Sequence, residues 1–138
     1  MLITVYSEAH AQSLDNEASI ASGHYDVELS ETGRKQAAGE KSQRYAGIEL
    51  DAVFTSDLRR AYETARIMFR GVDVPIIPDP RLRECDYGDM TRRPRSEIEG
   101  VRARHLGKPF PNGESYEQAM LRMKGFLDDV AADYGGKT

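Results

Sequence analysis

The sequence is poor in features that define whole classes of protein. It has no tryptophan and a single cysteine, Cys85, among 138 residues, so no disulfide forms within the chain and no four-cysteine metal site is available. No apolar run approaches the roughly 20 residues that a membrane-spanning helix needs. The first residues also lack the basic start and long apolar core of a signal peptide. We therefore expect a cytoplasmic protein without a membrane partner.

The sequence also lacks an excess of positive charge. Its 19 Lys and Arg residues face 23 Asp and Glu residues, a formal net charge of −4, which provides no general attraction to nucleic acid. An anionic substrate must therefore be held by a local group of cations. Hydrophobic residues make up 39% of the chain and charged residues 30%, a balance typical of one folded globular domain rather than of a disordered chain.

The hydrophobic pattern predicts alternating strands and helices. The expected strands cover residues 2–6, 50–55 and 74–77. The expected helices run from the N-cap Ser30 to before Gly47, from Ser56 or Asp57 through Phe69, near 96–106, and from the N-cap Ser115 to 135–136. Such alternation is typical of a three-layer α/β fold, a mostly parallel sheet with helices on both faces. The alternation breaks off after Gly136, so we interpret residues 1–138 as a single domain that lacks a C-terminal strand–helix unit of at least ~30 residues.

The stretch from Ile3 to Asn16 is where we expect the functional site. An apolar run there ends in His10 and is followed by small and polar residues. A strand that delivers an imidazole to the carboxyl edge of a sheet would look like this, and that edge is where α/β proteins bind ligands. A lone histidine in such a place is more often a hydrogen-bonded structural residue than a nucleophile. Its role therefore depends on the segments downstream.

Three segments resemble motifs of one family. Residues 10–16 (HAQSLDN) are similar to R-H-G-[EQ]-[ST]-x-x-N, residues 56–65 (SDLRRAYETA) to S-x-L-x-R-A-x-x-T-A, and residues 82–88 (LRECDYG) to L-R-E-x-x-[FY]-G. Weaker similarities lie at 29–37 and 111–115. In this order, and over nearly the whole chain, they resemble the histidine phosphatase superfamily, also called phosphoglycerate mutase-like. The resemblance implies a phosphoglycerate mutase-like fold and a reaction without a metal ion or cofactor.

The resemblance also implies roles for residues near the N-terminus and in the second motif. His10 would be the nucleophile, which attacks a phosphoryl group and carries it as phosphohistidine. Arg60 and Asn16 would bind the phosphate oxygens, because the transferring group needs cationic and amide donors around it. Gln12 and Ser13 would belong to the same phosphate site.

Glu84 is the candidate general acid. The resemblance implies that it protonates the leaving oxygen, which requires a carboxyl group kept protonated by burial or by the nearby phosphate. The alternative is a structural ion pair with Arg81 or Arg83.

Two departures from the family pattern concern the catalytic histidines. Ala9 stands where the family has an arginine directly before the nucleophile, and losing such a cation costs on the order of a hundredfold in rate. In an extended strand Glu8 projects to the same side as His10, so it would orient the imidazole and repel phosphate, or else point to solvent. The family's second histidine belongs to a late strand that this sequence lacks. Neither His24 nor His105 fits that role, and we expect both at the surface.

The sequence holds one basic cluster, made of Arg92, Arg93, Arg95, Arg102 and Arg104. It could hold a second anionic group of a substrate, or it could be a solvated loop. As a nucleic-acid site it lacks interleaved aromatic residues. Cys85 and Arg92 are one residue too far apart for a cysteine phosphatase, so we expect a buried, structural thiol.

These observations predict a phosphomonoester hydrolase, or a phosphotransfer or mutase relative, that acts on a small phosphorylated substrate. Hydrolysis is favoured because residues 81–114 are short for the substrate lid that the resemblance associates with true mutases. One alternative is a weakened or inactive relative that binds inorganic phosphate, other anions or a protein partner. Another is an α/β adaptor unrelated to phosphate. The oligomeric state is open, a homodimer included.

Overall fold

The computed structural model describes residues 2–135. The helices are α1 (Leu14–Glu17), α2 (Glu31–Gln36), α3 (Arg59–Met68), α4 (Arg95–Val101) and α5 (Tyr116–Tyr134), and the strands are β1 (Val53–Thr55) and β2 (Ile76–Pro78). A π-helical turn, Ala37–Lys41, continues α2, and 3₁₀ turns cover Pro80–Leu82, Gly88–Met90 and Arg102–His105. Among the described residues, no helix is long and apolar enough to cross a membrane.

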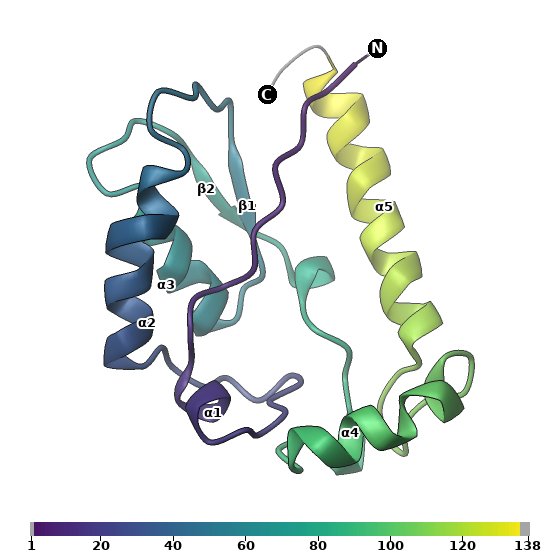
Figure 1. The fold of residues 1–138 in the computed structure, drawn as a ribbon. Helices are drawn as coiled ribbons and strands as arrows, with labels where there is room; N and C mark the ends of the chain where they lie inside the picture. Colours follow the sequence, from purple (N-terminus) through teal and green to yellow (C-terminus); the bar gives the residue numbers. More distant parts are fainter. Residues whose placement is uncertain (1, 136–138) are drawn as a thin grey trace.

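The two strands form a parallel sheet with helices on both sides. Val53, Phe54 and Thr55 pair with Ile76, Ile77 and Pro78, respectively. Figure 1 shows α2 and α3 on one side of the strands and α5 on the other. On the α5 side, the ring of Phe54 packs edge-on against Phe126 at 5.2 Å. The arrangement confirms the predicted α/β class, although both strands are shorter than the patterns over 50–55 and 74–77 predict.

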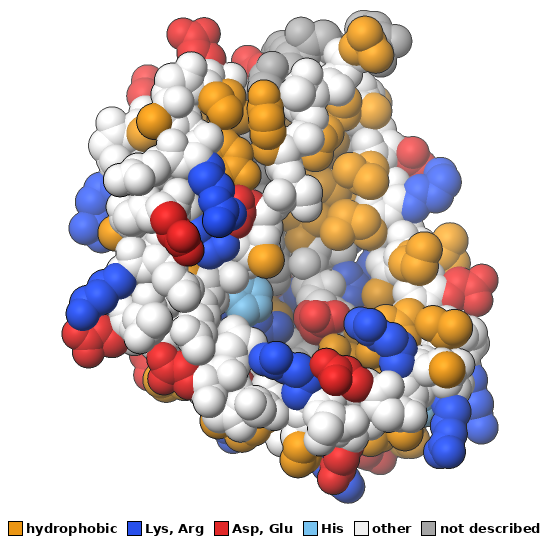
Figure 2. Space-filling view, in the orientation of Figure 1, with side chains coloured by type: hydrophobic (Ala, Val, Ile, Leu, Met, Phe, Trp, Pro, Cys, Tyr) orange, Lys and Arg blue, Asp and Glu red, His pale blue; other side chains and the backbone are white. Residues whose placement is uncertain are grey.

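The predicted strand over residues 2–6 is wrong. These residues are extended, but their backbone forms no ladder with any described strand. The Leu2 side chain is 89% exposed and Val5 58%, so the β-branched and aromatic residues do not lie on a buried sheet face. Figure 2 shows hydrophobic side chains gathered on the face of the molecule that it presents. The exposed large hydrophobic residues include Leu2 and Val5 of this segment and Met120, Leu121 and Leu127 of α5. A local pattern sets an extended conformation, but a strand also needs a partner strand.

The predicted cap of α3 is also wrong. The N-cap residue is Leu58, not Ser56 or Asp57. Ser56 Oγ instead accepts a hydrogen bond from Leu58 N at 3.1 Å, which closes the turn before the helix. The Asp57 carboxylate is held by Arg83 through two hydrogen bonds of 2.6 and 2.7 Å.

The predicted cap of α2 is confirmed, and it anchors the helix beside the His10 loop. Ser30 Oγ accepts a hydrogen bond from Gly33 N at 3.0 Å, and Ser30 N donates to Gln12 O at 3.0 Å. A Cβ at Gly33 would lie 1.9 Å from Gln12 O, which explains why this position needs glycine. The start of α2 therefore fixes the backbone two residues after His10.

The predicted cap of α5 is confirmed as well. Ser115 Oγ accepts from Gln118 N at 3.1 Å, and the Gln118 side chain accepts from Ser115 N at 2.9 Å, which together form a capping box. The helix predicted near 96–106 is present as α4 and the 3₁₀ turn that follows it.

We expect Ser115→Ala to lower the free energy of unfolding by about 1 kcal/mol, the usual cost of a lost N-cap. Urea denaturation followed by circular dichroism measures the change. Ser96→Ala is the matched control, because Ser96 is exposed in the first turn of α4 and caps no helix; it should shift stability by less than about 0.5 kcal/mol. Equal losses in the two variants would contradict the capping role.

Candidate active site

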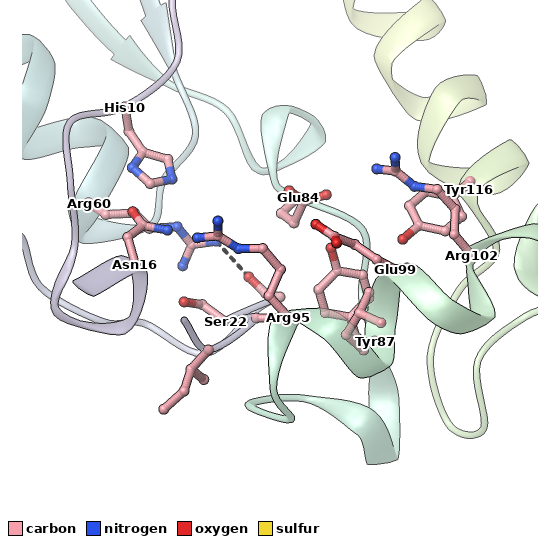
Figure 3. Close-up of a pocket in the computed structure, with 14 residues that line it drawn as sticks. His10, Asn16, Ser22, Arg60, Glu84, Tyr87, Arg95, Glu99, Arg102 and Tyr116 are labelled. Carbon is pink, nitrogen blue, oxygen red and sulfur yellow. Dashed lines mark hydrogen bonds between the residues drawn. The ribbon is translucent and has the colours of Figure 1, made fainter. Parts of the chain in front are cut away.

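A cavity of about 190 Å³ brings together four of the predicted site residues, His10, Asn16, Arg60 and Glu84. Figure 3 shows them around one space, with His10 from the extended N-terminal segment, Asn16 from α1, Arg60 from α3 and Glu84 from the segment after β2. Figure 2 shows a histidine side chain in the hollowed part of this face, beside side chains of both charge signs. Segments far apart in the sequence thus form one polar pocket.

His10 is held in the tautomer that a nucleophile needs. Its Nδ1 lies 2.6 Å from Ala11 O, and because a carbonyl oxygen can only accept, Nδ1 carries the proton. The Nε2 lone pair is therefore free in the neutral ring. Burial lowers the pKa of His10 below its ordinary value, and the Arg60 cation acts in the same direction against the opposing Ala11 carbonyl. The imidazole is thus neutral, and nucleophilic, at neutral pH.

We expect the ¹³Cε1 resonance of His10 to titrate with a midpoint below its ordinary value of 6.5, with assignment by the loss of the signal in His10→Gln. The unfolded chain binds this proton more tightly than the folded one, so stability is fully present above pH 6.5 and is lost as pH falls toward the folded pKa. A midpoint at or above 6.5 would contradict the desolvated environment.

Arg60 is a buried cation, and not all of its guanidinium N–H donors are used by the protein. Two backbone carbonyls bind its guanidinium: Nη1 donates to Tyr25 O at 2.8 Å and Nη2 donates to Gly23 O at 2.7 Å. The residue is only 5% exposed, and burial is the main cause that lowers its pKa, although an arginine stays charged at neutral pH. A guanidinium has five N–H donors, so those not bound to the two carbonyls can bind an anion in the cavity.

Asn16 lies in the cavity, but Ser13 and Gln12 do not line it. Asn16 Oδ1 accepts from Ser13 N at 2.9 Å, which leaves the Asn16 amide NH₂ as a donor. Ser13 is fully buried, and its Oγ caps α1 by accepting from Asn16 N at 3.1 Å. Gln12 contributes its backbone, whose N–H donates to Gln36 Oε1 at 3.1 Å. The structure therefore unites Asn16 with His10 and gives Ser13 a capping contact.

Glu84 lines the cavity and does not form the ion pair with Arg81 or Arg83 that was the alternative prediction. Arg81 is bound to Asp79 and Asp129, and Arg83 is bound to Asp57. Glu84 Oε1 instead accepts a hydrogen bond from the N–H of the next residue at 2.8 Å. The carboxyl group keeps its other oxygen for the cavity.

Glu8 neither orients His10 nor points freely to solvent, so both alternatives are wrong. Its carboxylate accepts hydrogen bonds from Lys41 at 2.7 Å, from Arg44 at 2.8 Å and from Tyr45 at 3.2 Å. The hydrogen bond from Lys41 is the main cause that lowers the pKa of Glu8. The carboxylate is thus neutralised by side chains of the π-helical turn that continues α2 and of the turn after it.

His24 is not a simple surface residue, contrary to expectation. Its Nε2 lies 2.8 Å from Glu84 O, and its side chain is 27% exposed. His105 is partly exposed and stacks on Phe110 at 4.0 Å, outside the cavity lining. Nothing in the local sequence around His24 predicts its contact, because the partner lies 60 residues away.

Sequence analysis also missed the role of Thr64. Its Oγ1 accepts a hydrogen bond from Ala11 N at 3.0 Å and donates to Arg60 O. One hydroxyl therefore joins the residue after His10 to the turn of α3 that carries the buried Arg60. The threonine in the 56–65 motif was the available signal.

Two arginines of the basic cluster, Arg95 and Arg102, line the cavity together with Glu99 and Tyr116. In Figure 3 the Arg95 side chain extends toward Asn16 and Arg60, whereas Arg102 lies beside Tyr116 on the far side of Glu84. Arg92 does not line the cavity and forms an ion pair of 2.9 Å with the buried Asp15.

Cys85 is buried, as expected. Burial raises the pKa of its thiol to about 12, so the thiol is protonated and unreactive at neutral pH.

Comparison with known proteins identifies the family. The model of the histidine phosphatase superfamily (branch 1) matches residues 9–138. The chain belongs to this superfamily. It is 35% identical over 135 residues to "Probable phosphoglycerate mutase GpmB" of Cronobacter sakazakii, which covers 92% of this chain and 62% of that protein. It is 36% identical over 130 residues to fructose-2,6-bisphosphatase TIGAR of Xenopus laevis, covering 86% of this chain and 46% of that protein.

Solved structures of this superfamily share the fold. A mycobacterial glucosyl-3-phosphoglycerate phosphatase complexed with VO3 superposes with a TM-score of 0.78 at 31% identity, covering 89% of this chain and 64% of that one. "Mycobacterial hydrolase 1" gives a TM-score of 0.82 at 27% identity, covering 93% and 64%. The chain thus spans less than two thirds of the length of these relatives. The fold is the phosphoglycerate mutase-like α/β fold expected from the motifs.

Proposed function

We propose that the chain carries the phosphoryl-transfer site of a phosphomonoester hydrolase, with His10 as nucleophile and Glu84 as general acid. The observation that carries the proposal is the His10 tautomer. Nδ1–H donates to Ala11 O, so Nε2 keeps its lone pair, and His10 lines the same cavity as Arg60, Asn16 and Glu84.

The proposed reaction has two steps, transfer of the phosphoryl group to His10 and hydrolysis of the phosphohistidine. In the first, the His10 Nε2 lone pair forms a bond to phosphorus, the P–O bond to the leaving group breaks, and Glu84 gives its proton to the leaving oxygen. Arg60 and Asn16 donate hydrogen bonds to the non-bridging oxygens, whose charge they stabilise. In the second, Glu84 takes a proton from water, the water oxygen bonds to phosphorus, and the N–P bond breaks to release phosphate and neutral His10.

The substrate we propose is a small phosphomonoester. Relatives named as a phosphoglycerate mutase, a fructose-2,6-bisphosphatase and a glucosyl-3-phosphoglycerate phosphatase all carry small phosphorylated compounds in their names. A cavity of about 190 Å³ suits such a compound, and the lining residues Arg95 and Arg102 provide cations for a second anionic group. We favour hydrolysis over mutase action, and a cytoplasmic location, on the sequence grounds given above.

Assay of p-nitrophenyl phosphate between about pH 5 and pH 8, a range that brackets the ordinary pKa of histidine, tests the proposal. Rapid acid-free quenching with ³²P-labelled substrate should trap label on His10. Absence of both turnover and labelling would contradict the proposal.

A phosphate-binding protein with little turnover is the second candidate, and Ala9 is the observation that favours it. Ala9 is exposed and contributes no cation to the cavity; its carbonyl accepts from Lys41 Nζ at 3.1 Å. Phosphate or vanadate would then raise the melting temperature of a chain that turns over little substrate.

Ala9→Arg separates the two candidates. We expect the new guanidinium to raise kcat/KM by up to about a hundredfold, the scale on which removal of such a donor acts. Ala9→Gln, a long but uncharged side chain, is the control and should raise it by much less. An unchanged kcat/KM in Ala9→Arg, with phosphate binding retained, would favour the binding protein.

A further inference from the structure

Residues 23–26 form a short loop that supports Arg60. Gly23 O and Tyr25 O accept the two hydrogen bonds from its guanidinium, at 2.7 and 2.8 Å. Gly23 has a φ of +55°, and a Cβ there would lie 2.9 Å from the Tyr87 ring, so this loop packs closely on the segment that follows Glu84. It is therefore fixed both to α3 and to the opposite wall of the cavity.

His24 lies between Gly23 and Tyr25 in the sequence, and its side chain extends to the backbone of Glu84. Its Nε2 is the donor to Glu84 O at 2.8 Å, since a carbonyl only accepts. Asp86 and Glu114 face the same ring at 3.7 and 3.9 Å, too far for hydrogen bonds. Arg122 donates to the same Glu84 oxygen at 2.8 Å, but from α5. His24 is thus the side chain that joins the Glu84 backbone to the loop that supports Arg60.

We propose that His24 is a positioning residue, which holds the Glu84 carboxyl group at a fixed place relative to the phosphate bound by Arg60. This inference rests on the proposed function. Glu84 Oε1 is already fixed by Cys85 N at 2.8 Å, so anchoring the backbone carbonyl determines where the second carboxyl oxygen points. A proton donor must lie within hydrogen-bond reach of the leaving oxygen, and small displacements cost much of its effect.

Two carboxamide variants isolate the hydrogen bond. In His24→Gln the side-chain amide nitrogen occupies nearly the place of imidazole Nε2 and can donate to Glu84 O. In His24→Asn the amide is one bond shorter and ends near the place of Nδ1, so it cannot reach that carbonyl. Both variants are uncharged and polar, so they differ mainly in reach.

Leaving-group dependence is the first readout. The dinitrophenolate released from dinitrophenyl phosphate is a good leaving group and departs without a proton. The phenolate released from phenyl phosphate is a poor leaving group and needs a proton from the general acid. We expect His24→Asn to lower kcat on phenyl phosphate by about ten- to a hundredfold, part of the usual contribution of acid catalysis, and on dinitrophenyl phosphate by less than about threefold. His24→Gln should restore most of the loss. Equal losses on both substrates, or no rescue by glutamine, would overturn the proposal.

Cys85 provides a readout that does not depend on turnover. It is the only cysteine, it is buried, and its N–H binds the Glu84 side chain. Loss of one hydrogen bond from the segment should speed its reaction with an aromatic disulfide reagent by about fivefold in His24→Asn, with His24→Gln near the wild-type rate. An unchanged rate in His24→Asn overturns the positioning role. If the thiol reacts faster in His24→Asn but the wild-type protein turns over no substrate, the hydrogen bond from His24 to Glu84 is supported and the proposed function is refuted.

Discussion

His10→Ala is expected to lower turnover of aryl phosphates by at least about a thousandfold, because removal of a catalytic nucleophile leaves only the binding and electrostatic contributions of the site. The neutral ring, its Nδ1 proton bound to Ala11 O, is the nucleophile that we propose among the residues that line the cavity. Steady-state assays with dinitrophenyl phosphate, where chemistry needs least acid assistance, measure the loss.

Phosphate binding should survive that substitution. Arg60 keeps its two carbonyl partners without the imidazole, so vanadate or phosphate should still raise the melting temperature of His10→Ala. His105→Ala is the histidine control, since His105 lies outside the cavity lining, and it should keep at least about a third of the wild-type rate. Turnover retained in His10→Ala would place the nucleophile elsewhere and refute the assigned mechanism.

The sequence motifs identified residues that the structure brings together, whereas the hydrophobic pattern predicted the strands less accurately. His10, Arg60 and Glu84 were each identified from a short motif, and all three line one cavity. A motif combines residue type with spacing, and both can be read from the sequence without knowledge of tertiary contacts. The strand over 2–6 failed because its ladder would require a partner that local composition does not specify.

The remaining errors concern polar contacts between distant segments. Glu8 is bound by Lys41 and Arg44, and His24 by Glu84. The sequence shows that these side chains are charged or polar, but which of several complementary partners each one meets depends on how the loops fold over the sheet. Ser13 was predicted only as part of the phosphate site, and its observed hydrogen bond is that of a helix cap.

Arg60→Lys is expected to lower kcat/KM by about a hundred- to a thousandfold, the usual effect of removing one donor that stabilises charge in the transition state. Lysine keeps the charge but loses the planar fork, so it cannot bind Gly23 O and Tyr25 O and still present donors to phosphate. The two carbonyls then lose their partners, and each such loss costs about 1–3 kcal/mol where the group is buried. Urea denaturation should therefore show a less stable protein.

Arg59→Lys is the matched control for this loss, because it makes the same chemical change one residue earlier on α3. The Arg59 side chain is 54% exposed and does not line the cavity; its NH2 donates to Asp26 O at 2.9 Å, where a lysine ammonium can also donate. We expect kcat/KM to fall by less than about threefold, since exposed ion pairs contribute little. If instead the two variants lost activity equally, the burial of Arg60 against the loop would have no part in catalysis. A loss confined to Arg60→Lys assigns the effect to the geometry of the buried fork.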